Sequence, residues 1–233
     1  MKNILYCIVV HDIKIIEHFE KINKYQSLCN YRYILVGDQG NIHTSDKIIQ
    51  ANIQPDNIED MKHYLAYTGW WAFSKNLLDS FTEEYIFFLE YDTDIINLNS
   101  IELMESNILD SGLDVIGIDS LPTNVCFYEF FDPYIAELMN YRDSEYWLVT
   151  NNICFRRSAL EKFINAPELL QVFKHLNNVK GSGHALERYT TIYSSSRGFQ
   201  IGTIYPACLQ HLAMDSHDTQ GRFGIYQNFK NNI

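Results

Sequence analysis

The sequence predicts an α/β fold in which a central, mostly parallel sheet is flanked by helices. Short apolar runs alternate with helical patterns through the first half of the 233-residue chain, as strand-helix-strand units require. An apolar content of 46% is enough to form a sizeable core. No change in composition marks a linker, so we expect one domain over residues 1–233, more mixed in its second half.

The first strand is expected at residues 4–10, where seven apolar side chains precede His11 and Asp12. Asp12 suits the N-cap of the helical pattern that follows over residues 15–22. Further strands are expected at residues 33–36, 47–51 and 85–90.

Gly69 is expected to interrupt the next helical pattern. This pattern starts at residue 57, and a separate helix is expected over residues 70–81. Farther along, Asn99 and Glu102 form a capping box that predicts another helix start.

The second half is expected to contain short helices and strands. Asp132-Pro133 reads as a helix start, because proline is tolerated at the first helical position, and Ser158 reads as a second helix cap. Strands are expected at residues 113–119, 146–155 and 199–205, and a helix at residues 184–194.

Charge and composition narrow the function classes. With 29 acidic and 18 basic side chains, the formal net charge is −11, which disfavours a general attraction to nucleic acid or anionic lipid. No apolar run is long enough to span a membrane and no signal-peptide cleavage site is evident, so we expect a cytoplasmic protein. Five scattered cysteines lack Cys-x-x-Cys spacing and are expected to be reduced.

An acidic cluster follows the strand expected at residues 85–90. Glu90, Asp92 and Asp94 alternate, so they share a face if the strand continues to residue 94. Ligands of open α/β sheets bind at the carboxyl ends of parallel strands, and clustered carboxylates there favour a hard cation, Mn²⁺ or Mg²⁺. The alternative is a solvated turn, since 15 aspartates in 233 residues give roughly one Asp-x-Asp pair by chance.

The block GWWAFSKNLLDSFTEEYIFFLEYDTD, residues 69–94, resembles nucleotide-sugar glycosyltransferases of the GT-A fold, particularly family 2. In that family a Gly, a small residue and a basic-Asn pair precede a buried strand that ends in Asp-x-Asp. Gly69, Ala72, Lys75-Asn76 and Asp92-Thr93-Asp94 follow this order. Residues 150–163 resemble the strand and helix of the acceptor half, and residues 184–206 resemble the helix with the late acidic residue.

The resemblance implies site residues. Asp92 and Asp94 would bind the metal and the donor, with His211 as a further metal ligand; His217 is the weaker match. The paired late acids of the family appear here as the single Glu187, which would act as the catalytic base.

Donor contacts are also implied. Lys75 matches a basic residue near the donor diphosphate, and Asp38 and His11 end strands where this fold contacts the nucleotide. Strand-end turns favour Asp for backbone reasons alone, and a lysine on a helix is often solvated. For these residues a donor contact and a purely structural role therefore both stay open. Trp70 and Trp71 are expected in the core rather than as a sugar-stacking platform.

We therefore expect a metal-dependent, inverting glycosyltransferase of polysaccharide biosynthesis. It would transfer sugar from a UDP-, GDP- or dTDP-sugar to a glycan or lipid-linked acceptor, with residues 1–120 as the nucleotide-sugar half and 121–233 as the acceptor half and tail. A retaining transferase would use the same Asp-x-Asp site. A nucleotidyltransferase would need a Gly-rich basic loop, which VVHDIKII lacks. A carbohydrate-binding module is the non-enzymatic alternative, and peripheral association with a membrane stays open.

Overall fold

The computed structural model describes residues 3–37, 40–61, 66–118, 120–122, 146–148, 151–176, 182–204 and 208–211. For residues 121, 122, 146, 147, 176, 182–185 and 211 it describes the backbone alone. The expected helix start at Asp132-Pro133, and also Asp38 and His217, lie outside the described residues.

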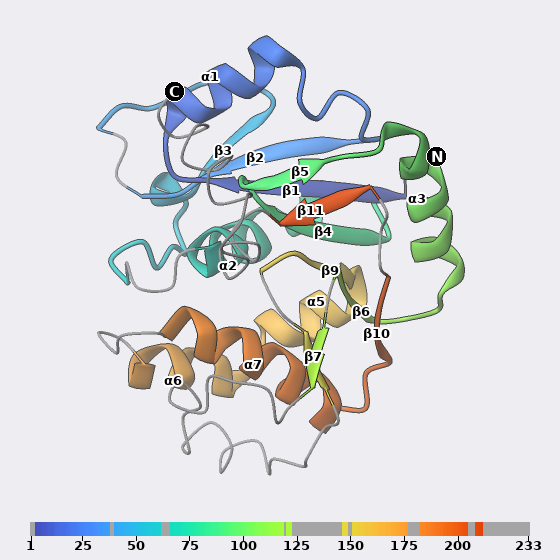
Figure 1. Ribbon diagram of the computed structural model, residues 1–233. Helices are drawn as coiled ribbons and strands as arrows, with labels where there is room; N and C mark the ends of the chain where they lie inside the picture. Colours follow the sequence, from blue (N-terminus) through green and yellow to red (C-terminus); the bar gives the residue numbers. More distant parts are fainter. Residues whose placement is uncertain are drawn as a thin grey trace, which may run out of the picture.

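The main sheet has seven strands in the order β10-β6-β9-β4-β1-β2-β3 (Figure 1). Strand β9 is antiparallel to β4 and β6, and the other neighbours pair in parallel. The predicted mostly parallel α/β sheet is confirmed, and both halves of the chain supply strands to it. The strands are β1 (Ile4–Val10), β2 (Tyr31–Leu35), β3 (Ile48–Gln50), β4 (Tyr85–Glu90), β6 (Val115–Gly117), β9 (Ile153–Arg156) and β10 (Ile201–Thr203).

Helices cover both faces of this sheet, which is why all seven residues of β1 are buried. Leu5, Cys7 and Val9 point to one core and the residues between them to the other. The first core contains side chains of α2 (Ala66–Asn76), α5 (Arg157–Ile164), α6 (Pro167–Leu176) and α7 (Ser182–Ser196). The second contains side chains of α1 (Ile13–Ile22) and α3 (Ile101–Asp110). In Figure 1, α1 lies at the top of the view and α6 and α7 lie at the bottom.

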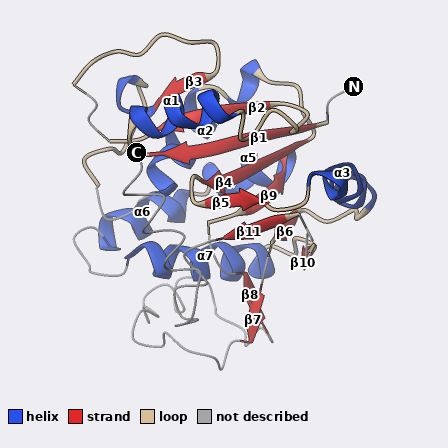
Figure 2. Cartoon of the chain, turned by 45° about the horizontal axis from the view of Figure 1, so that its top comes forward, coloured by secondary structure: helices blue, strands red, loops and turns tan. Residues whose placement is uncertain are grey.

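Two small antiparallel pairs are separate from the main sheet (Figure 2). One joins β5 (Thr93–Ile95) to β11 (Leu209–His211), and the other joins β7 (Ser120–Pro122) to β8 (Tyr146–Leu148). The expected single strand over residues 146–155 is therefore wrong, because β8 and β9 belong to different sheets. Short 3₁₀ turns are η1 (Ala51–Ile53), η3 (Leu78–Ser80) and η4 (Leu98–Ser100).

Gly69 does not interrupt a helix, contrary to the prediction. It lies inside α2, where a Cβ atom would come within 2.9 Å of Val36 Cγ1 and 3.0 Å of Ile34 Cγ2. The glycine lets α2 approach the ends of β1 and β2 closely, and tertiary packing outweighs its low helix propensity.

One predicted cap is confirmed and two are wrong. Asp12 Oδ1 accepts a hydrogen bond of 2.9 Å from the Lys14 amide at the start of α1. Ser158 lies inside α5, which starts one residue earlier and has no side-chain cap. Asn97, rather than Asn99, caps the turn before α3 by accepting a hydrogen bond from the Asn99 amide.

Within the described part of the chain, no helix is both long and apolar enough to cross a bilayer.

Candidate active site

The acidic residues lie on a turn at the carboxyl end of β4. The strand ends at Glu90, Tyr91 and Asp92 form a turn, and β5 starts at Thr93. The three carboxylates therefore do not share one continuous strand. Instead β5 pairs with β11, which places Asp94 opposite Gln210 and Thr93 opposite His211.

Two asparagines before β9 hold this turn. Asn152 Oδ1 accepts hydrogen bonds from the Glu90 amide at 2.9 Å and from Thr93 Oγ1 at 2.8 Å. Asn151 Nδ2 donates to Glu90 Oε1 at 2.7 Å. Thr93 and Asn152 are both fully buried, so these bonds fix the turn against the antiparallel strand.

Lys24 holds the turn from the opposite side. Its ammonium lies 2.7 Å from Asp94 Oδ1 and donates to the Tyr91 carbonyl at 3.2 Å. The neighbouring Tyr25 hydroxyl donates to the Thr93 carbonyl at 3.2 Å. Burial lowers the pKa of Lys24 below its ordinary value, although the charges of Asp94 and Asp92 act to raise it.

His11 lies at the same turn. It follows β1 directly, is exposed, and meets the Tyr91 ring edge-on with ring centroids 4.8 Å apart. His211 belongs to β11 beside the turn, but its side chain is outside the description. The structure thus brings the backbone of His211 and the ring of His11 to the acidic residues.

Glu187 lies on α7 and is 8% exposed. One turn farther along this helix, Thr190 Oγ1 lies 3.4 Å from the hydroxyl of Tyr67 of α2. Burial raises the pKa of Tyr67, and the charges of Glu187 and Glu90 raise it further. Glu187 and Glu90, the last residue of β4, therefore both act electrostatically on one buried hydroxyl.

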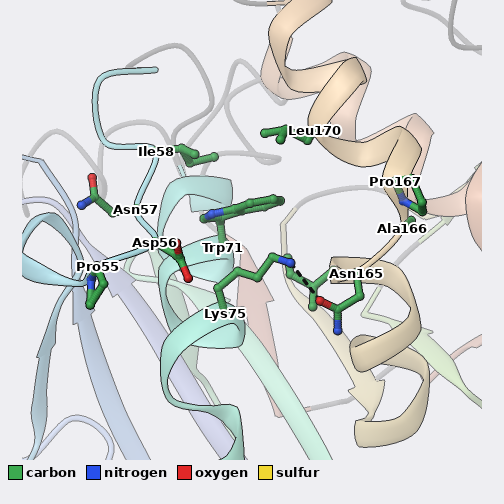
Figure 3. A pocket seen from close by; sticks show the side chains of 11 residues that line it. Pro55, Asp56, Asn57, Ile58, Trp71, Lys75, Asn165, Ala166, Pro167 and Leu170 are labelled. Carbon is green, nitrogen blue, oxygen red and sulfur yellow. Dashed lines mark hydrogen bonds between the residues drawn. The ribbon is translucent and has the colours of Figure 1, made fainter.

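Lys75 is not brought to the acidic turn. It lies near the carboxyl end of α2. The 3₁₀ turn η3 after this helix contacts Arg157, and Arg157 follows the residue of β9 that pairs with the first residue of β4. Lys75 therefore lies toward the start of β4, whereas the acidic turn follows its end. Lys75 Nζ donates to Asn165 Oδ1 at 2.8 Å and lies 5.1 Å from the centroid of Trp71 (Figure 3). These residues line a separate pocket of about 460 Å³ between α2, the loop before it and the α5–α6 junction.

The neighbouring tryptophans are core residues, as predicted. Trp70 is 1% exposed and stacks on Phe88 with ring centroids 4.7 Å apart. Trp71 is 8% exposed and meets Phe173 edge-on.

The donor set of the turn fits a hard divalent cation. Asp92 and Asp94 supply carboxylate oxygens, and the Asp94 side chain is 38% exposed, so solvent reaches it. Among the described side chains, no group of three His, Cys, Asp or Glu residues converges on one point. A cation bound here would therefore complete its coordination shell with water, phosphate oxygens or residues that the structure does not describe.

The described fold has a solved counterpart. The apo structure of the bifunctional glycosyltransferase WbbM superimposes on 85% of this chain with a TM-score of 0.59 and 12% sequence identity. The fold is of the GT-A type. This chain spans 44% of the length of WbbM. Because the sequence identity is low, the likeness is limited to the fold.

Other comparisons are weaker. The bifunctional IspDF from Campylobacter jejuni matches 87% of this chain and 49% of its own, with 9% identity and a TM-score of 0.44. TarS 1–349 from S. aureus matches 90% of this chain and 59% of its own, with 12% identity and a TM-score of 0.41. No protein-family model and no curated protein match the sequence.

Sequence reasoning missed three residues that hold the acidic turn. Asn151 and Asn152 stand in the block that resembles the acceptor half, but their contacts with residues 90 and 93 depend on β9 being antiparallel to β4. Lys24 follows the end of α1, and no sequence spacing connects it to Asp94.

Proposed function

We propose that the chain is a metal-dependent glycosyltransferase that moves a sugar from a UDP-, GDP- or dTDP-sugar to a glycan or lipid-linked acceptor. The observation that carries this proposal is the acidic turn of Asp92 and Asp94 at the carboxyl end of β4 in a GT-A fold. Residues 1–120 would form the donor half and residues 121–233 the acceptor half of one domain. A role in polysaccharide biosynthesis is proposed from the family resemblance, and a cytoplasmic location stays a prediction from the sequence.

The donor side of the reaction is assigned to the turn. Asp92 and Asp94, with His211 as a further ligand, would hold Mn²⁺ or Mg²⁺, which offsets the negative charge of the leaving diphosphate. The exposed ring of His11 borders the same turn and is assigned to the donor nucleotide together with Asp38. The role of Lys75 in donor binding stays a prediction, since its described contacts are with Asn165 and Trp71.

The acceptor side is assigned to Glu187. Its carboxylate would take the proton of the acceptor hydroxyl while the oxygen forms a bond to the anomeric carbon. The bond from that carbon to the diphosphate breaks at the same time, and its electron pair leaves with the phosphate. Attack opposite the leaving group inverts the anomeric centre. The burial of Glu187 and its electrostatic influence on Tyr67, which Glu90 at the end of β4 shares, support this assignment.

Nucleotide binding with and without metal tests the proposal. We expect UDP, GDP or dTDP to raise the melting temperature of the full chain only when Mn²⁺ or Mg²⁺ is present. The double variant Asp92→Asn/Asp94→Asn should lose this effect, whereas Asp46→Asn, on an exposed loop, should keep it. If the double variant binds nucleotide and metal like the wild type, the assignment is wrong.

A further inference from the structure

A buried lysine is built into the acidic turn. Lys24 follows Asn23, whose left-handed backbone (φ 54°) ends α1 and turns the chain back toward β5. Its side chain is only 9% exposed, and its ammonium lies 4.3 Å from the centroid of the Phe19 ring. Together with the contacts to Asp94 and the Tyr91 carbonyl, this packing fixes the ammonium.

The buried position of the Lys24 ammonium is stable only while the ammonium stays paired with Asp94 and the Tyr91 carbonyl. A lysine loses much of its hydration in such a position, and the loss is offset by a carboxylate and a carbonyl at hydrogen-bond distance. The Lys24–Asp94 pair differs from a solvated surface pair, because the lysine is packed against Phe19 and its ammonium meets two acceptors.

The ammonium and a divalent cation would use the same oxygens. Residues 90–94 carry three formal negative charges, on Glu90, Asp92 and Asp94, and the charge of Lys24 offsets one of them. A fixed positive charge a few ångströms from a second cation repels it strongly in a partly buried site. A nucleotide diphosphate adds negative charge on the open side of the turn and counteracts this repulsion.

We propose that Lys24 is a resident cation of the acidic turn, which weakens binding of a divalent metal alone and makes tight metal binding depend on the donor diphosphate. The inference rests on the proposed metal site and adds a residue that sets the order in which this site fills. Lys24 is a positioning residue in this scheme, since it acts through Asp94.

Metal binding to the full chain without nucleotide tests this role. Lys24→Met removes the charge but keeps an apolar chain against Phe19, and we expect Mn²⁺ to bind about tenfold tighter, measured by the electron paramagnetic resonance of free Mn²⁺. Lys21→Met is the matched control, because it removes the same charge from an exposed position in the last turn of α1. Unchanged or weaker Mn²⁺ binding in Lys24→Met, or an equal gain in Lys21→Met, would overturn the proposal.

A second measurement covers the case in which Lys24→Met does not fold. In wild-type protein labelled with ¹⁵N-lysine, the ammonium resonance of Lys24, assigned with Lys24→Arg, should shift when Mg²⁺ is added with UDP, GDP or dTDP. An ammonium signal that stays unmoved while other resonances show metal binding would contradict the role.

The two proposals fail in different ways. If nucleotide does not strengthen metal binding in the wild type, the proposed function is wrong, whereas the comparison of Lys24→Met with wild type in metal alone decides the role of Lys24. Failure of Mn²⁺ to bind any of the three proteins would overturn the role of Lys24 as well.

Discussion

The amide oxygen of Asn152 lies 2.8 Å from the hydroxyl of Thr93, and both residues are fully buried. This contact joins the antiparallel strand β9 to the acidic turn. The same oxygen also accepts the Glu90 amide at 2.9 Å, so a single side chain fixes the turn on both sides of Asp92.

Asn152→Ala should therefore loosen the acidic turn. It leaves the Glu90 amide and the Thr93 hydroxyl without this acceptor, and we expect the free energy of unfolding to fall by about 2–4 kcal/mol, measured with urea. Metal-dependent nucleotide binding should weaken as well, because Asp92 and Asp94 lose their fixed spacing.

Asn99→Ala, on an exposed 3₁₀ turn, is the control and should change stability by less than about 0.5 kcal/mol. If Asn152→Ala matched this control in both measurements, the asparagine would have no part in holding the turn.

The close contact at Gly69 gives a prediction about packing. Gly69→Ala improves the helix propensity by about 1 kcal/mol, but the added methyl overlaps Val36 and Ile34, and overpacking costs about 1–3 kcal/mol. We expect a net loss of stability of about 1 kcal/mol. In the double variant Gly69→Ala/Val36→Ala the loss should be smaller than the sum of the single losses, since the smaller residue makes room.

Denaturant unfolding of the four proteins in this cycle measures the coupling directly. If the losses in the free energy of unfolding are additive, Val36 does not limit the size of the side chain at position 69.

The strands with the strongest local signal are the ones that the sequence predicts correctly. Residues 4–10 and 85–89 are continuous apolar runs, and they form β1 and, together with Glu90, β4, as predicted. Such runs are buried on both faces of a parallel sheet, so their pattern does not depend on the neighbouring strands. Asp12 is similarly local, because its cap needs only the amide two residues later.

The wrong predictions depend on tertiary contacts. Gly69 has a low helix propensity, yet α2 runs through it, and the missing side chain lets this helix pack closely against Val36 and Ile34. The strand expected over residues 146–155 is divided, since residues 146–148 pair with β7, whereas Asn151 and Asn152 bond to Glu90 at the end of β4. Neither contact can be inferred from the spacing of nearby residues.

The candidate site was predictable only in part. The position of Asp92 and Asp94 after a buried strand is visible in the sequence, as is the acidic residue at 187. Lys75, the basic residue that the family pattern suggests, lies in a different pocket, and the lysine that contacts the acids comes from a segment 70 positions before Asp94. Long-range ion pairs of this kind are fixed by topology, which a single sequence does not encode locally.

Glu187→Gln separates an inverting transferase from a retaining one. The amide keeps the size of the side chain but cannot take the proton of an acceptor hydroxyl, so transfer should slow by about 10²–10⁴-fold if Glu187 is the base. The affinity for nucleotide and Mn²⁺ should stay close to that of the wild type, because the donor is assigned to the acidic turn and Glu187 to the acceptor side. Glu17→Gln, on the exposed face of α1, is the control and should leave both measurements unchanged. Transfer at nearly the wild-type rate in Glu187→Gln would instead favour a retaining reaction, in which the stereochemistry of the product, read by nuclear magnetic resonance, would match that of the donor.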